Sequence, residues 1–137
     1  MTLRHFLIAV TTALSAGLLP AHDAPAQGMD GKALFAKNCA ACHQPTGKGI
    51  PGAFPALAGN GFVQGPPAEV AAVLLKGRGG MPDFSGSLDD GEIAQVLSYV
   101  RTSWGNSAAP LSAGQVAAQR GSLGVAPASH NPFGNKH

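Results

Sequence analysis

The chain contains 137 residues, of which 45 % are hydrophobic and 12 % are charged. This length accommodates one domain, and so apolar a composition excludes a charge-rich disordered protein. The formal net charge of +2 is too small to indicate a nucleic-acid-binding protein. Two cysteines cannot form the disulfide framework of a small secreted scaffold, while 19 glycines and 11 prolines indicate many loops around a small core.

Residues 1–26 have the layout of a secretory signal peptide. Arg4 precedes a mostly apolar stretch, and Ala24-Pro25-Ala26 supplies the small residues of a cleavage site before Gln27. The apolar stretch is shorter than the roughly 20 residues that a membrane-spanning helix needs, so we prefer a cleaved signal to a membrane anchor. We therefore expect an exported protein that is cleaved near Ala26/Gln27 and has no stable membrane insertion afterwards.

The first helix is expected from Gly31 to about Asn38, where Asp30 can cap its first turn. The segment 44–66 holds six glycines and four prolines, which excludes a long helix or strand there. No later stretch alternates between polar and apolar residues for long, so a sheet is not expected. The pattern therefore predicts an all-α protein with long loops.

Two further helices follow this loop. Pro67 is a favourable first helical residue and Gly77 a favourable stop, with apolar residues at helical spacing between them. After a loop over 78–88, a capping box of Asp89 and Glu92 begins a helix that extends to about Ser103 and has one apolar stripe.

The last part of the chain is rich in alanine, glycine and serine. Residues 111–120 could form a brief helix, and otherwise we expect residues 107–137 to be a flexible, loosely structured tail. The domain then spans 27–106, with three to four helices and about 75 packed residues. A core of this size is marginal without a metal, a disulfide or a cofactor.

Cys39-Ala40-Ala41-Cys42-His43 is a C-x-x-C-H sequence. Two thiols at this spacing can form thioether bonds with the two vinyl groups of one haem, and the adjacent His43 can ligate its iron. A thioredoxin-like pair would need a βαβ setting, and a zinc site would need ligands from the tail histidines His130 and His137. A structural disulfide would leave His43 unexplained. We therefore predict one covalently attached haem c.

Met81 is the candidate for the sixth iron ligand. Met1 leaves with the signal peptide, and Met29 lies just before the first helix. The two glycines before Met81 let the backbone approach a haem, and Pro82 stiffens the exit from the loop. A methionine thioether suits a low-spin iron that exchanges electrons without binding substrate. A vacant sixth position or a histidine from the tail are the alternatives.

Together, the C-x-x-C-H motif, the Gly80-Met81-Pro82 loop and the closing helix resemble a class I cytochrome c, over about residues 29–106. The resemblance implies a small cytochrome c fold wrapped around the haem. It also implies that Gly31 and Phe35 of the first helix meet Tyr99 of the last one. A loop proline carbonyl accepts the axial histidine's ring N–H in this family, and Pro55 fits that position best, with Pro51 as the alternative.

The segment 98–106 further resembles the cytochrome subunits of periplasmic dehydrogenases. The resemblance implies a periplasmic electron-transfer protein with no catalytic residues of its own, which cycles between Fe(III) and Fe(II) as a free carrier or as a subunit of a dehydrogenase or oxidase. Its partners would be a periplasmic dehydrogenase, a cytochrome complex or a terminal oxidase of a respiratory chain. A small haem enzyme or a gas-binding haem sensor, with a displaceable sixth ligand, is the alternative function.

Seven apolar residues are candidates for the wall around the porphyrin: Phe54, Leu57, Phe62, Val73, Leu74, Phe84 and Leu97. Three cations, Lys48, Lys76 and Arg78, are close in sequence to the two ligand loops. They could steer an acidic redox partner toward the haem, or they could be ordinary solvated side chains.

Overall fold

The computed structural model describes residues 30–129, and within this range it is all-α. Only two isolated backbone bridges, Ile50 with Phe54 and Arg78 with Met81, interrupt the loops of the described part. The expected signal peptide and residues 130–137 lie outside it. The helices are α1 (Gly31–Asn38), α2 (Ala40–His43), α3 (Pro67–Lys76), α4 (Asp90–Thr102) and α5 (Ala113–Ser122).

The three helices that the sequence predicts are present, and their starts have the expected physical causes. The Asp30 carboxylate accepts a hydrogen bond from the Ala33 N–H at 2.8 Å, which caps α1. Pro67 occupies the first turn of α3, where its missing N–H costs nothing. Asp89 and Glu92 form the predicted capping box at α4.

The short α2 was not predicted, because four residues carry no helical periodicity that a sequence pattern could reveal. It follows α1 after a break at Cys39, whose φ of −124° and ψ of −32° are not helical. The Cys39 N–H still donates to the Phe35 carbonyl oxygen at 2.9 Å, so the two helices remain connected by hydrogen bonds. This break turns the C-x-x-C-H segment away from the axis of α1.

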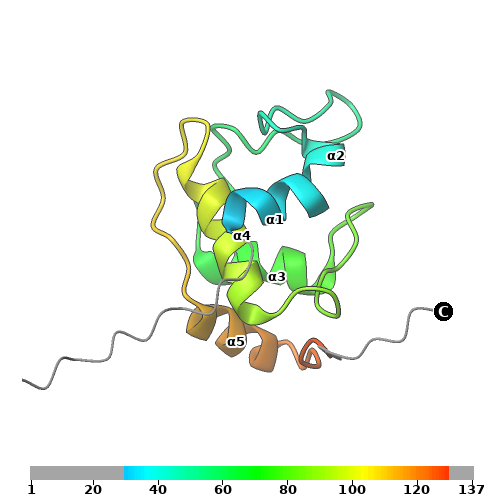
Figure 1. Cartoon of the computed structure of the whole chain (residues 1–137), viewed down its shortest axis with the longest axis vertical. Coiled ribbons are helices and arrows are strands. Elements are labelled where there is room, and N and C mark those ends of the chain that lie inside the picture. Colours follow the sequence, from blue (N-terminus) through cyan, green and yellow to red (C-terminus); the bar gives the residue numbers. More distant parts are fainter. Residues whose placement is uncertain (1–29, 130–137) are drawn as a thin grey trace, which may run out of the picture.

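The first and the fourth helix cross at very close range, as the family resemblance implies (Figure 1). A Cβ at Gly31 would overlap the Gln95 carbonyl oxygen, so only glycine permits this approach. Phe35 packs beside Tyr99 and Trp104, with ring centroids 5.6 and 5.0 Å away. These tilted aromatic contacts stabilise the crossing beyond simple burial of area.

The apolar core is formed by α1, α3, α4 and α5 together with Val63, Leu88 and Leu111 from three connecting loops. Its largest fully buried side chains are Phe35, Leu34, Leu75, Ile93, Val96 and Val116. Because Val116 belongs to α5, the last helix is part of this core.

The structure differs from the expected loose tail over residues 107–129. A capping box of Ser112 and Gln115 starts α5, and the helix packs against α3 and α4 (Figure 1). Val116 is fully buried and Arg120 is 4 % exposed. The two residues are four positions apart and so share one helix face. Residues 30–129 therefore contain five helices instead of three to four. The additional ones are the short α2 and α5, which corresponds to the brief helix considered over 111–120 and is ordered by tertiary contacts despite its weak amphipathic pattern.

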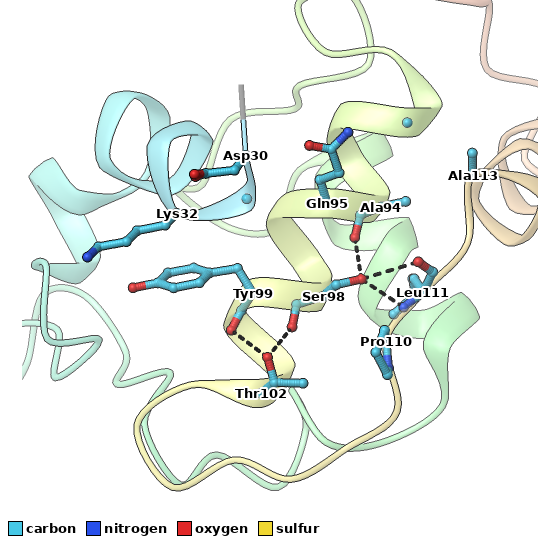
Figure 2. A pocket seen from close by; sticks show the side chains of 12 residues that line it. Asp30, Lys32, Ala94, Gln95, Ser98, Tyr99, Thr102, Pro110, Leu111 and Ala113 are labelled. Atoms are coloured by element: carbon cyan, nitrogen blue, oxygen red, sulfur yellow. Dashed lines mark hydrogen bonds between the residues drawn. The ribbon is translucent and has the colours of Figure 1, made fainter. Parts of the chain in front are cut away.

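The connection from α4 to α5 is attached to α4 along its length. The Ser98 hydroxyl donates to the Ala94 carbonyl oxygen at 2.6 Å and accepts from the Leu111 N–H at 3.0 Å (Figure 2). The Arg101 Nε–H donates to the Ala109 carbonyl oxygen at 2.9 Å. These bonds direct the chain back across the molecule and bring α5 onto the core.

Candidate functional site

The structure places all five predicted site residues around one cavity of about 580 Å³. Its wall contains Cys39, Cys42, His43, Pro55 and Met81, which come from α1's end, α2 and two separate loops. In Figure 1, α2 lies above the loop that connects α3 with α4, and both line this cavity. The volume falls in the range of about 300–1,000 Å³ that is typical of cofactor sites.

His43 is buried, with 7 % of its surface exposed, and its ring is oriented by the backbone of the following loop. Its Nδ1 lies 3.0 Å from the Pro55 carbonyl oxygen. A carbonyl can only accept, so Nδ1 carries the proton and donates it, which leaves the free lone pair on Nε2. The accepting carbonyl belongs to Pro55 and not to Pro51.

The loop that contains Pro55 is folded tightly onto α2. The Gly49 N–H donates to the His43 carbonyl oxygen at 2.9 Å. Gly49 has a φ of 63°, and a Cβ there would lie 2.6 Å from the Pro55 carbonyl oxygen. Glycine at this position therefore allows the loop to bring the Pro55 carbonyl to the imidazole.

The two cysteine thiols are free and differ in their surroundings. Cys39 is partly buried and Cys42 is exposed. Burial, assisted by the neighbouring Cys42, raises the pKa of the Cys39 thiol to about 11. The Cys39 sulfur is therefore protonated at neutral pH before any covalent attachment, and both thiols remain available for thioether bonds.

Met81 is located in a tight turn at the other side of the cavity from α2. The N–H groups of Arg78 and Met81 each donate to the other residue's carbonyl oxygen, at 3.1 and 3.0 Å. Gly77, directly after α3, has a φ of 72°, and a Cβ there would lie 2.7 Å from the Met81 carbonyl oxygen. The sequence drew attention to the two glycines directly before Met81, and only the structure identifies Gly77 as the glycine that the approach to α3 requires.

Six of the seven residues expected in the wall line the cavity, namely Phe54, Leu57, Phe62, Val73, Leu74 and Leu97. The seventh, Phe84, packs against the core instead. Its N–H donates to the Leu74 carbonyl oxygen at 2.7 Å, which ties the Met81 loop to α3. The wall is therefore mostly apolar, which lowers the local dielectric around a bound group.

Phe54 and Phe62 are 39 % and 38 % exposed although they line the cavity, so they mark its mouth. The Arg78 guanidinium lies 4.6 Å from the centre of the Phe62 ring, in a cation–π contact. Of the three cations considered from the sequence, Arg78 is thus at the mouth itself. Lys48 and Lys76 are exposed.

A second hollow of about 660 Å³ lies on another side of α4 (Figure 2). It is lined by the start of α1, by α4 and by residues 110–113, and includes Lys32 and Tyr99. Among the residues that the structure describes, no cysteine, histidine or methionine lines it. It therefore lacks the ligands that the first cavity collects.

Residues 26–100 match the family described as cytochrome c oxidase, cbb3-type, subunit III. This range covers more than half of the chain and contains the whole cavity wall. The chain belongs to this family of c-type cytochromes. More specifically, it is a class I monohaem c-type cytochrome, because it has a single C-x-x-C-H sequence.

Three relatives illustrate the range of proteins to which this cytochrome is similar. Cytochrome c-552 of Thermus thermophilus is 39 % identical over 93 residues, which cover 57 % of this chain and 70 % of the relative. The cytochrome c subunit of the quinone alcohol dehydrogenase of Gluconobacter oxydans is 36 % identical over 94 residues, covering 60 % and 20 %. Cytochrome c6 of Synechocystis sp. is 36 % identical over 77 residues, covering 51 % and 60 %.

The residues of the cavity fit the covalently bound haem c of this family. Two thiols, an imidazole with an oriented ring and a thioether are present in an apolar cavity of suitable volume. These are the donor types that hold haem in c-type cytochromes. As a member of this family, the cytochrome is an electron-transfer protein with one haem c. None of the helices within residues 30–129 is long and apolar enough to span a bilayer.

Two buried polar side chains that support the cavity wall were missed by sequence reasoning. Arg101 is 3 % exposed, and its Nη1 donates to the carbonyl oxygens of Val63 (2.6 Å) and Gly65 (2.9 Å). Burial lowers the pKa of its guanidinium. Asn106 is 5 % exposed, and its Nδ2 donates to the Leu57 carbonyl oxygen at 2.9 Å. Both residues lie in the segment 98–106 on which the resemblance to dehydrogenase subunits rests, and Arg101 is beside the apolar stripe of the last predicted helix, but neither signal indicated these contacts.

Proposed function

We propose that Cys39 and Cys42 would hold the haem through thioether bonds, and that His43 and Met81 would supply the two protein ligands of its iron. The observation that carries this proposal is the convergence of all four side chains on one cavity, with His43 held by the Pro55 carbonyl. Because Nδ1 donates to Pro55, Nε2 is the nitrogen that would bind iron. The hydrogen bond also makes the imidazole a stronger ligand.

The residues of the chain then have separate tasks. The haem supplies, when bound, the one-electron Fe(III)/Fe(II) couple. His43 and Pro55 fix one ligand, and the Arg78–Met81 turn holds the other, so neither ligand needs to move on reduction. The apolar wall excludes water and, together with a thioether ligand, favours a raised reduction potential.

The redox partner docks, in this proposal, at the cavity mouth around Phe54 and Phe62. These two rings are exposed at the edge of the cofactor site, and Ile50 adds a third exposed apolar side chain at 39 %. Arg78 adds a positive charge at this mouth, and the exposed Lys48 and Lys76 are close in sequence to the two ligand loops. An acidic protein surface with an apolar centre complements this arrangement, and a small transient interface suffices for electron transfer.

The cytochrome is exported in this proposal, with residues 1–26 removed, and works in the periplasm as part of a respiratory chain. Residues 27–106 are the cytochrome domain, and residues 107–137 are a C-terminal extension. The relatives include both a protein named only as a cytochrome and a subunit of a dehydrogenase. The chain could therefore act as a free carrier or as the subunit of a larger enzyme. Purification at native abundance would distinguish the two, because only a subunit would co-purify with a large partner.

The test of the ligand assignment is the visible spectrum of the mature protein, produced with a c-type haem assembly system. We expect a low-spin spectrum with the weak far-red sulfur-to-iron band, and haem that stays with the protein in acidified solvent. Met81→Ala should lose the band, whereas Met29→Ala, a second methionine outside the described residues, should keep it. A high-spin ferrous form that binds carbon monoxide readily in the unmodified protein would overturn the assignment and favour a haem enzyme or gas sensor.

A further inference from the structure

Arg120 is a buried cation of α5 that contacts the loop carrying Met81. Its guanidinium is almost fully buried. Nη1 donates to the Ser85 carbonyl oxygen at 3.0 Å, and Nη2 donates to the Leu88 carbonyl oxygen at 3.3 Å. Nε donates to an Asp90 carboxylate oxygen at 2.7 Å. One side chain thus joins both ends of the segment 85–90 to the last helix.

The same guanidinium is itself held in place by the chain that follows α5. Nη1 also donates to the Ala126 carbonyl oxygen at 2.7 Å. The Val125 N–H donates to the Arg120 carbonyl oxygen at 3.1 Å. One helical turn earlier, Val116 is fully buried in the core. Arg120 is therefore a fixed support, because rotation of its side chain would break several hydrogen bonds at once.

Between Met81 and Ser85 the loop belongs to neither a helix nor a strand. It is held by the Arg78–Met81 turn, by the bond from the Phe84 N–H to the Leu74 carbonyl oxygen, and by the packing of Phe84 against the core. The Ser87 and Leu88 N–H groups donate to the Phe84 carbonyl oxygen at 3.1 and 2.9 Å, which links this part of the loop to the segment that Arg120 binds. Leu88, which ends the loop, is buried at 5 % exposure. Opening the Met81 side of the cavity would therefore require the segment 82–88 to move away from α5 as well as from α3.

We propose that Arg120 is a positioning residue for the Met81 ligand, and that α5 holds the Met81 loop closed against the cavity through the Ser85 and Leu88 carbonyl oxygens. This inference rests on the proposed role of Met81. It assigns the C-terminal extension a task in setting how firmly the sixth ligand is held, in addition to its contribution to the core.

The experiment uses the mature holoprotein and compares Arg120→Met with Arg101→Met. Arg101 is the matched control, because it is an equally buried guanidinium that binds three carbonyl oxygens, none of them in the Met81 loop. Imidazole added to the ferric protein competes with the thioether for iron. Its apparent affinity therefore reports how often the loop opens. Backbone amide exchange at Met81, Phe84 and Leu88 reports the same opening without reference to the iron.

We expect Arg120→Met to raise the apparent affinity for imidazole about tenfold, the effect of losing charged hydrogen bonds that hold the closed loop. The far-red band should weaken, and amide exchange in the loop should accelerate. Arg101→Met removes support from the Val63 side of the cavity wall but none from the Met81 loop. It should therefore raise imidazole affinity clearly less than Arg120→Met does, and leave amide exchange at Met81, Phe84 and Leu88 at the parent rate, under conditions in which both proteins are folded. Arg120→Lys, which keeps the charge but fewer donors, should lie between the parent and Arg120→Met. Arg120→Lys also replaces Arg120→Met as the test variant if Arg120→Met does not fold with its haem.

Equal effects of the two variants on imidazole affinity, or parent-like affinity in Arg120→Met and Arg120→Lys, would overturn the inference. Failure of the proposed function would have a different signature, since a far-red band that survives Met81→Ala would exclude Met81 as the ligand. In that case the role of Arg120 toward the ligand is refuted with it, while faster loop exchange would still mark a purely structural contact.

Discussion

Replacing Gly77 with alanine tests how closely the Met81 loop has to approach the end of α3. Gly77 has a φ of 72° and a ψ of 173°, a conformation found essentially only in glycine. The added Cβ would lie 2.7 Å from the Met81 carbonyl oxygen and 3.1 Å from the Asp83 nitrogen. Both neighbours are backbone atoms, so relief requires the loop itself to shift.

The magnitude follows from these two effects. Backbone strain of about 1–3 kcal/mol adds to about 1–3 kcal/mol for a contact that the structure has to relieve. The reduced entropy of the unfolded chain returns about 0.4–1 kcal/mol. These contributions span about 1–5.6 kcal/mol, and we expect Gly77→Ala to lower the free energy of unfolding by about 3 kcal/mol, near the middle of that range, as measured by urea titration of the haem-containing protein.

Gly59→Ala is the matched control. Gly59 also has a positive φ, of 62°, but a Cβ there meets no atom within 4 Å. Strain alone should then cost about 1 kcal/mol after the same entropy correction. Gly77→Ala should in addition weaken the far-red band before unfolding, and Gly59→Ala should not. Equal losses of stability in the two variants, with both bands intact, would refute the reasoning.

Three other predictions concern separate parts of the molecule. Gly31→Ala should destabilise the protein by about 2–4 kcal/mol in thermal or urea unfolding, because its Cβ would overlap the Gln95 carbonyl oxygen at the helix crossing; parent-like stability would contradict the close approach. Arg78→Glu should slow electron transfer with an acidic redox protein about tenfold at low ionic strength in stopped-flow measurements. Salt at about 0.5 M screens such charges strongly, so a difference in rate between variant and parent that persists there would exclude electrostatic steering. Mass spectrometry of the secreted protein should show a chain that starts at Gln27, and an intact N-terminus would support a membrane anchor over cleavage after Ala26.

The local elements of this cytochrome follow from its sequence because their causes are local. Asp30, Pro67 and the pair Asp89 and Glu92 start helices by satisfying or omitting backbone N–H groups within one turn. Similarly, the chemistry of the C-x-x-C-H sequence depends on neighbouring residues and needs no knowledge of the rest of the chain. The haem type could therefore be predicted together with the helices.

The burial of the segment after α4 could not be predicted from the sequence. Val116 and Arg120 are four residues apart on one helix face, but two residues do not form a periodic pattern. A short helix of this composition gains most of its stability from tertiary packing. Its burial therefore became apparent only once α3, α4 and the loop over 85–90 were in place around it.

By itself, the sequence determined the helical class, the main helix starts, the covalent haem and a short set of candidate ligands, since each depends on residue type and close spacing. The tertiary structure decided which proline carbonyl meets His43, which glycine lets the Met81 turn approach α3, and what the C-terminal extension contacts. These are contacts between segments that are distant in the chain. Their geometry is set by the packing of all helices together, so no local pattern encodes it.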